Sequence, residues 1–188
     1  MAIGKVLDPT ALRGEDISTP GPDAGPLQGK VVGFRLDEIW RSWDWVAEIW
    51  AEAFRDAGAT VRFWRSSQGR TGAEGERVAN SLEEFLDAID IAVVGLANCG
   101  SCTGWTIHDA LAASARDLPT TAVCTENFLD LGRNLARRGG RSGLRLHVLP
   151  YPLNEREKAE VEAVARAHLP GMVRTMGAQL SPAVESLA

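Results

Sequence analysis

Apolar positions fall into short runs separated by stretches in which apolar residues recur every three or four positions. The runs are rich in β-branched residues and bounded by turn formers, which is typical of buried strands. Five such runs predict strands at residues 30–35, 59–65, 91–96, 119–124 and 144–150. The intervening stretches have the period of amphipathic helices. Strands that alternate with helices predict βαβ units and a parallel sheet.

We therefore expect an α/β fold, a three-layer sandwich with a five-stranded parallel flavodoxin-like sheet in the order 2-1-3-4-5. Helices are expected at residues 37–58, 82–89, 103–116, 126–138 and 155–168. Ser81 with Glu84 has capping-box spacing and predicts the start of the second helix. Asn154 with Glu157 predicts the start of the last one.

The helical stretch at residues 37–58 is rich in tryptophan. Five apolar side chains recur on one face and predict its buried side: Ile39, Trp43, Val46, Trp50 and Phe54. Trp40 and Trp45 fall off this stripe. The favoured interpretation is a broad aromatic core face, and the alternative is that the extra tryptophans line a pocket or a subunit contact.

Three segments are expected along the chain. Residues 1–28 hold four prolines and several glycines and predict an extended arm without a core of its own. Residues 29–170 form a single α/β domain, and residues 171–188 form a C-terminal tail.

Composition narrows the classes of function. The 188 residues carry a formal net charge of -5, which disfavours nucleic acid and anionic membranes as partners. No stretch is apolar enough for a signal peptide or a spanning helix, so we expect a cytoplasmic protein. Three cysteines are too few for a disulfide framework in a reducing compartment, and any disulfide would be transient.

The chemistry is concentrated in the turn after the third strand, Cys99-Gly100-Ser101-Cys102. The N–H groups at the start of the following helix stabilise a thiolate, which is the nucleophilic form of a thiol. Gly100 allows a close approach of the backbone to a ligand. Ser101 or Thr103 is expected to cap the helix or to donate to an oxyanion.

Other interpretations of these cysteines remain. A structural zinc site needs four ligands, and the remaining Cys124, His108, His147 and His168 lack paired spacing. The two cysteines could also be small packing residues. His108 and Asp109 lie too far along the helix to serve the thiols easily, and a core His–Asp pair is the favoured interpretation.

The loop after the fourth strand is expected beside the double-cysteine turn, so that all three cysteines gather at one sheet edge. Glu126 follows that strand and is the acid–base candidate. Our expected catalytic residues are Cys99, Cys102 and Glu126. The expected substrate-binding residues are Asn98, Gly100, Ser101, Thr103, Cys124 and Thr125. We expect no metal and no dissociable cofactor.

The stretch GLANCGSCTGWTIHDA resembles the signature of the UGSC-like (seleno)protein family, which carries selenocysteine or cysteine at the first motif position. Further stretches match in order: LDPT, LQGKVVGF, VCTENF and VLPYPL. The family is similar to selenocysteine-bearing subunits of glycine and proline reductases. This resemblance implies chemistry at Cys99 with Cys102 as the resolving thiol. Two departures, RLDEIWRSWDW after the first strand and Tyr151, fall where we expect the pocket lining.

The leading hypothesis is a thiol-dependent enzyme acting on a small molecule, with an external thiol donor that restores the cysteine pair. A redox-neutral isomerase, lyase or hydratase would use the same thiols. A non-catalytic subunit that needs a partner chain is the third hypothesis. We also expect a homo-oligomer.

Overall fold

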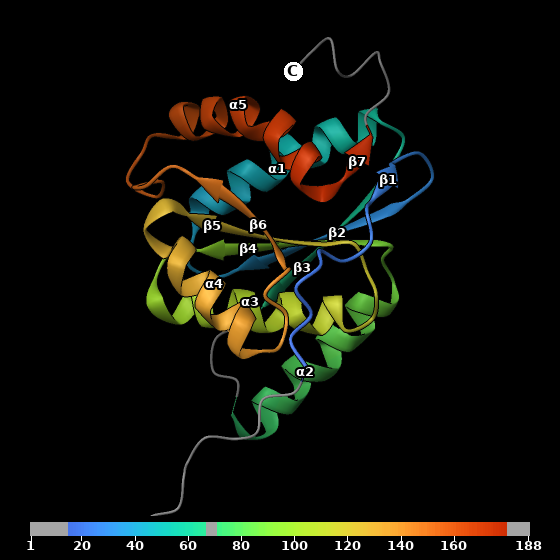
Figure 1. The fold of residues 1–188 in the computed structure, drawn as a ribbon. Coiled ribbons are helices and arrows are strands. Elements are labelled where there is room, and N and C mark those ends of the chain that lie inside the picture. The colour runs from blue at the N-terminus through green and yellow to red at the C-terminus, as the bar shows by residue number, and fades with distance from the viewer. Residues whose placement is uncertain (1–14, 67–70, 180–188) are drawn as a thin grey trace, which may run out of the picture.

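The computed structural model describes residues 15–66 and 71–179, which form three layers (Figure 1). A parallel sheet lies in the middle, helices α1 and α5 cover one face, and α2, α3 and α4 cover the other. The three-layer α/β sandwich expected from the sequence is confirmed.

The central sheet has five strands in the order β3-β2-β4-β5-β6, and every neighbouring pair is parallel. The strands are β2 (Val31–Asp37), β3 (Thr60–Ser66), β4 (Ile91–Ala97), β5 (Thr120–Thr125) and β6 (Arg145–Leu149). In chain order this is the predicted flavodoxin-like arrangement 2-1-3-4-5. Strands β2, β4 and β5 lie between neighbours on both sides and are almost wholly buried, because helices cover both faces of the sheet.

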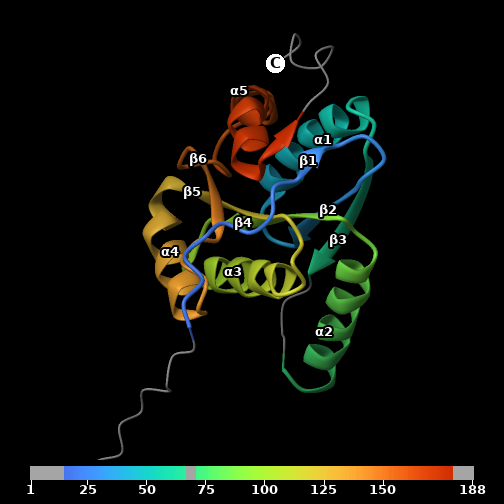
Figure 2. The ribbon, with the colours of Figure 1, turned by 45° about the vertical axis from the view of Figure 1, so that its right-hand side comes forward.

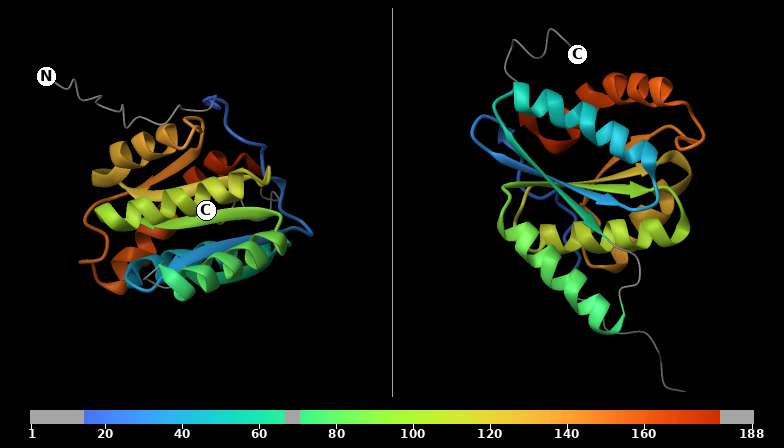
Figure 3. Two further views of the ribbon diagram at one scale, coloured as in Figure 1. Left: turned by 90° about the horizontal axis from the view of Figure 1, so that it is seen from below. Right: turned by 180° about the vertical axis from the view of Figure 1, so that it is seen from behind.

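Five α-helices and one short 3-10 helix connect the strands in the described ranges (Figures 2 and 3). They are α1 (Arg41–Asp56), α2 (Gly72–Asp87), α3 (Gly100–Ser114), η1 (Glu126–Phe128), α4 (Leu129–Arg138) and α5 (Lys158–Met176). Among these helices, none is long and apolar enough to cross a membrane.

Aromatic side chains of α1 build the larger core cluster, between the sheet and α5. Trp43 and Trp50 meet edge to face at 5.8 Å between ring centroids, a favourable geometry for aromatic pairs. The Trp50 indole N–H donates to the carbonyl of Ala165 at 2.8 Å and so links α1 to α5. Trp40 and Trp45 are partly buried against this cluster. Ile39 is 42% exposed because the helix begins only after it, which corrects the expected stripe.

Two predicted helix starts are wrong. Helix α2 begins at Gly72, so Ser81 lies inside the helix, where its hydroxyl accepts the indole N–H of Trp64. Helix α5 has a capping box three positions further along than expected, formed by Glu157 and Glu160.

The expected segment boundaries also shift. Helix α5 continues through Pro170 to Met176, so residues 171–176 belong to the core helix and not to a tail. Beyond it, β7 (Ala178–Gln179) pairs with β1 (Gly25–Pro26). Ala24 and Leu27 are buried in the larger core cluster, and so the end of the expected arm belongs to the domain. Residues 1–14 and 180–188 of the expected arm and tail lie outside the described residues.

Candidate functional site

The strand order places a crevice between the ends of β2 and β4. From β2 the chain leads to β3 on one side, whereas β4, β5 and β6 follow on the other. Connections that leave in opposite directions open a crevice beyond the carboxyl ends of such strands. Asp37 ends β2 at this crevice, and Asn98 and Cys99 directly follow β4. The double-cysteine turn therefore lies at the position where this fold binds ligands.

Cys99 is the N-cap of helix α3. Its backbone is extended, and its sulfur accepts the backbone N–H of Cys102 at 3.2 Å. The hydroxyl of Thr103 donates to the carbonyl of Cys99 at 2.6 Å. The sequence predicted that Ser101 or Thr103 would cap the helix, but the sulfur of Cys99 takes that place because Cys99 precedes the first helical residue. One helix N–H therefore points directly at the sulfur.

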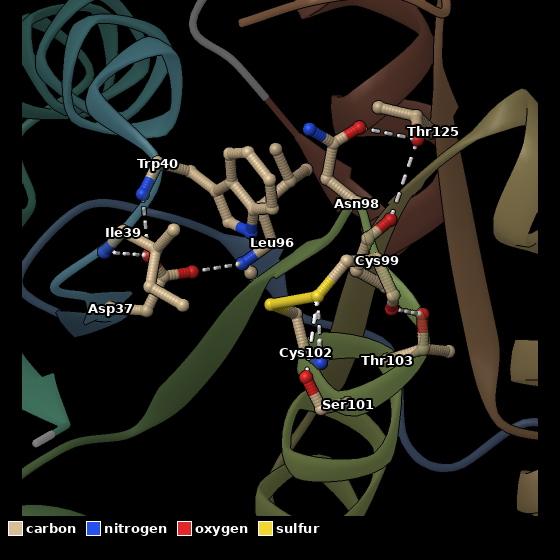
Figure 4. Close-up of a disulfide and its surroundings, with 12 residues drawn as sticks. Asp37, Ile39, Trp40, Leu96, Asn98, Cys99, Ser101, Cys102, Thr103 and Thr125 are labelled. Carbon is tan, nitrogen blue, oxygen red and sulfur yellow. Dashed lines mark hydrogen bonds between the residues drawn. A yellow bond between two sulfur atoms is a disulfide. The ribbon is translucent and has the colours of Figure 1, made fainter. Parts of the chain in front are cut away.

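Cys99 and Cys102 form a disulfide, with their Cα atoms 5.2 Å apart (Figure 4). This separation lies within the usual range for disulfides. Cys99 is partly exposed, whereas Cys102 is buried at 7% exposure. Gly100 and Ser101 are exposed, and the Ser101 hydroxyl lies 3.5 Å from the Cys99 sulfur. Of the two sulfurs, that of Cys99 belongs to the more accessible residue.

Asn98 and Thr125 link the ends of β4 and β5. The Thr125 hydroxyl donates to the Asn98 side-chain oxygen at 2.8 Å (Figure 4). Thr125 and Thr103 are both fully buried, at 0% exposure. Both were expected to bind substrate. In the structure Thr125 orients Asn98, and Thr103 holds the backbone of Cys99.

Cys124 does not share the surface of the other two cysteines. Its side chain is fully buried and donates to the carbonyl of His147 at 3.7 Å. Burial raises the pKa of its thiol to about 12. Cys124 does lie at the expected edge of the sheet, in register with Ala97 at the end of β4, but its side chain is buried there.

Glu126 opens η1 directly after β5 and is exposed. Its charge acts on His168: burial lowers the pKa of His168, and Glu126 partly opposes that shift. Within the described part of the chain, no hydrogen bond joins Glu126 to either cysteine of the turn. No group of three His, Cys, Asp or Glu side chains in residues 15–66 and 71–179 is placed to hold a metal ion.

Asp37 is a site residue that the sequence analysis missed. One carboxylate oxygen accepts the backbone N–H groups of Ile39 and Trp40, each at 2.8 Å. The other accepts the N–H of Leu96 at 3.3 Å (Figure 4). Asp37 therefore links the loop between β2 and α1, residues 38–40, to the end of β4. An aspartate just after a predicted strand, at a position where a turn begins, is the signal that could have identified it.

Asp109 is buried as expected, but its main partner is not histidine. Its carboxylate pairs with the guanidinium of Arg35 at 2.9 Å. His108 approaches the other oxygen at 3.1 Å, and its side chain is 63% exposed. The expected core His–Asp pair is thus corrected to a buried Arg35–Asp109 pair with an exposed histidine at its outer end.

A pocket of about 130 Å³ adjoins the turn through Asn98. Its lining combines the start of α1 with the segment after β6: Trp40, Asn98, Tyr151, Pro152, Leu153, Asn154 and Glu155. The segment after the first strand and Tyr151 were expected to line a pocket, and Trp40 of that segment and Tyr151 both contribute to this lining.

The chain was compared with the models of known families. The model of the UGSC family covers residues 5–178, which includes all of the site residues described above. No curated protein matches the chain.

Proposed function

This chain belongs to the UGSC family, and on that premise we propose that it is a cytoplasmic thiol-dependent oxidoreductase that acts on a small molecule. The observation that carries the proposal is the position of Cys99. This residue caps helix α3 at the crevice of a doubly wound sheet, with Cys102 within disulfide range.

Cys99 acts as the nucleophile in this proposal. The N–H of Cys102 and the N-terminal end of the 15-residue helix α3 favour negative charge on its sulfur. Cys99 is the more exposed of the two residues, whereas Cys102 is buried. Cys102 therefore acts second, as the resolving thiol.

The proposed reaction is a two-electron reduction. The Cys99 thiolate attacks one atom of a reducible bond A–B and displaces B, which takes up a proton. Cys102 then attacks the sulfur of Cys99, and A leaves with the second proton. The products are A–H, B–H and the Cys99–Cys102 disulfide. An external dithiol, which is oxidised in turn, restores the cysteine pair.

Glu126 is proposed to supply a proton to the leaving group. It is exposed just beyond the end of β5, next to Thr125, at the carboxyl edge where ligands bind in this fold. Thr103 and Thr125 serve by fixing Cys99 and Asn98. We also propose that the protein forms a homo-oligomer.

A redox titration tests this function. The protein is equilibrated in dithiothreitol buffers of graded potential, and the thiols are counted after trapping with maleimide. We expect one reversible two-electron transition, assigned to Cys99 and Cys102 by peptide mass spectrometry, with the fold retained by circular dichroism. A pair that stays reduced across the range would favour redox-neutral chemistry. A pair that opens only on unfolding would contradict both enzymatic versions.

A further inference from the structure

The outer edge of strand β3 is open. β3 ends the central sheet on one side, and in the described ranges β2 is the one strand that pairs with it. The view from behind looks onto this strand, with no other described strand beyond it (Figure 3, right). At the opposite end of the sheet, β6 is covered in part, because the guanidinium of Arg145 donates to the carbonyl of Pro22 and pairs with Asp23.

The backbone of β3 offers hydrogen-bonding groups at this edge. The N–H of Thr60 donates to the carbonyl of Lys30, just before β2, at 2.8 Å. Successive residues of a strand direct their N–H and C=O groups to opposite sides, and the register between β2 and β3 is unbroken over the whole of β3. The groups of Val61, Phe63 and Arg65 therefore point away from the sheet. Such a row of unpaired groups is a template for another strand.

The side chains at the middle of β3 are aromatic. Phe63 is 42% exposed, although it packs on Phe34 at 5.6 Å between ring centroids. On the other face of the strand, Trp64 lines a groove of about 390 Å³ together with Arg62 and Glu84. The open edge thus has an aromatic residue on each face of the sheet, with charges of both signs beside it.

A second copy of the chain fits this edge through a two-fold axis. β3 runs from Thr60 to Ser66, so Phe63 is its midpoint. An antiparallel pair of β3 strands with the axis at Phe63 overlaps along the whole strand, and any other axis shortens the overlap. Phe63 then faces Phe63 of the second copy, and Val61 faces Arg65. These are the residues whose backbone groups point outwards, and each such pair exchanges two hydrogen bonds.

The charges favour the same register. Arg62 faces Trp64 of the second copy, where its guanidinium meets an indole ring, and Glu84 in the same groove offers a counter-charge. An axis at Arg62 would instead oppose two arginines directly, which destabilises a strand pair. Arg65 already has a counter-charge within its own chain, since Asp44 pairs with it at 3.0 Å.

We propose that two copies of this chain associate through the outer edges of β3, antiparallel and with the two-fold axis at Phe63, so that their sheets become continuous. A contact of this kind uses the same surface on both copies. The inference rests on the homo-oligomer in the proposed function and names its interface. It does not depend on the chemistry of the cysteines.

The oligomeric state tests this interface. Sedimentation equilibrium of the full-length protein should give twice the mass of one chain at high concentration. Phe63→Lys places two like charges opposite each other at the axis, and should raise the dissociation constant at least about a hundredfold. Leu131→Lys is the matched control. Leu131 is 38% exposed on α4, which packs on β5 and β6, so this variant should stay dimeric.

Cross-linking tests the register and decides even if Phe63→Lys fails to fold. In the oxidised protein Cys99 and Cys102 are joined and Cys124 is buried. Phe63→Cys then adds a thiol at the axis, which a short bismaleimide should link to the same position of the second copy. Thr60→Cys is the control on the same strand. In the proposed pairing its two thiols lie about six residues of strand apart, ~20 Å, and should not be linked.

Three results would overturn the inference. A monomeric wild type would leave the edge of β3 to another occupant and would remove the proposed oligomer as well. A Phe63→Lys variant that folds and stays dimeric would place the interface elsewhere and leave the oligomer standing. Equal cross-linking of Phe63→Cys and Thr60→Cys would refute the antiparallel register. Labelling of Cys99 decides the proposed thiol chemistry separately.

Discussion

Arg35 and Asp109 form a buried ion pair, 2.9 Å from Nε to the carboxylate, although 74 residues separate them in the chain. The same guanidinium donates to the carbonyl of Gly95 at 2.8 Å. One side chain of β2 therefore bonds to both β4 and α3, the two elements that flank the cysteine turn.

Breaking that pair should destabilise the fold strongly. Asp109→Ala leaves the Arg35 guanidinium buried at 3% exposure with its main counter-charge removed, and we expect a loss of about 3–5 kcal/mol in the free energy of unfolding. Urea denaturation followed by tryptophan fluorescence measures it. Glu83→Gln, which removes the surface partner of Arg116, is the control and should cost at most about 1 kcal/mol. Similar losses in the two variants would refute the structural role given to Arg35.

Cys124 should be inert in the folded protein. Full burial and a pKa raised to about 12 keep its thiol both covered and protonated. Iodoacetamide at pH 8 should therefore leave the native residue unmodified over a time in which a free thiol reacts completely, and should modify it after denaturation. Rapid native labelling would mean that Cys124 belongs to the reactive site after all.

The fold could largely be read from the sequence because its three central strands are almost wholly buried and alternate with stretches of helical period. The cysteine turn was also predictable, since Cys99 and Cys102 flank a strand-to-helix junction. The burial of Cys124 was not, because a residue after an apolar run faces either side of the sheet depending on a register that only the neighbouring strands determine.

Long-range contacts account for most of what the sequence did not reveal. The role of Asp37 depends on the N–H of Leu96, 59 residues away. Asp109 contacts the adjacent His108, as predicted, but its second partner, Arg35, lies on strand β2 and could not be inferred from the local sequence. Helix α5 extends past Pro170 because Met172 and Met176 bury their side chains, which outweighs the local preference against proline in a helix.

The boundary of the N-terminal arm can be tested with one core residue. Leu27 is 1% exposed within the larger core cluster, so Leu27→Ala should cost about 2–5 kcal/mol in the free energy of unfolding. Ile17→Ala, at a position that is 46% exposed, should stay within about 0.5 kcal/mol of the wild type. Deletion of residues 1–20 should leave the circular dichroism spectrum of the domain intact. If Leu27→Ala left the free energy of unfolding unchanged, residues 24–28 would belong to the arm and not to the core.

Stability should fall on mild acidification. Burial, helped by the positive charges of His168 and Arg174, lowers the pKa of His147 from 6.5 to about 4. Below pH 6.5 the unfolded chain binds a proton at this residue that the native state does not, so the free energy of unfolding decreases as the pH falls from 6.5 towards 4. The loss from this group is at most ~3 kcal/mol.

Urea titrations at pH 7 and pH 4.5 measure this effect. The wild type should lose more stability between the two values than His147→Gln does, because glutamine has no proton to take up. His108→Gln is the control, and its exposed side chain should leave the pH dependence close to that of the wild type. An unchanged pH dependence in His147→Gln would show that other groups determine the acid sensitivity.

The central claim is that Cys99 is an activated nucleophile. Its most direct test is the pH dependence of alkylation of the reduced protein with limiting iodoacetamide, read by peptide mass spectrometry. We predict that Cys99 is labelled first. We also predict that its labelling rate reaches half-maximum at a pH below ~8.5, the pKa of a free thiol. Cys102 should follow slowly, and Cys124 should stay unmodified. If Cys99 is labelled no faster than Cys102, or only above pH 8.5, or only after denaturation, the turn is a packing element and the enzymatic account is contradicted.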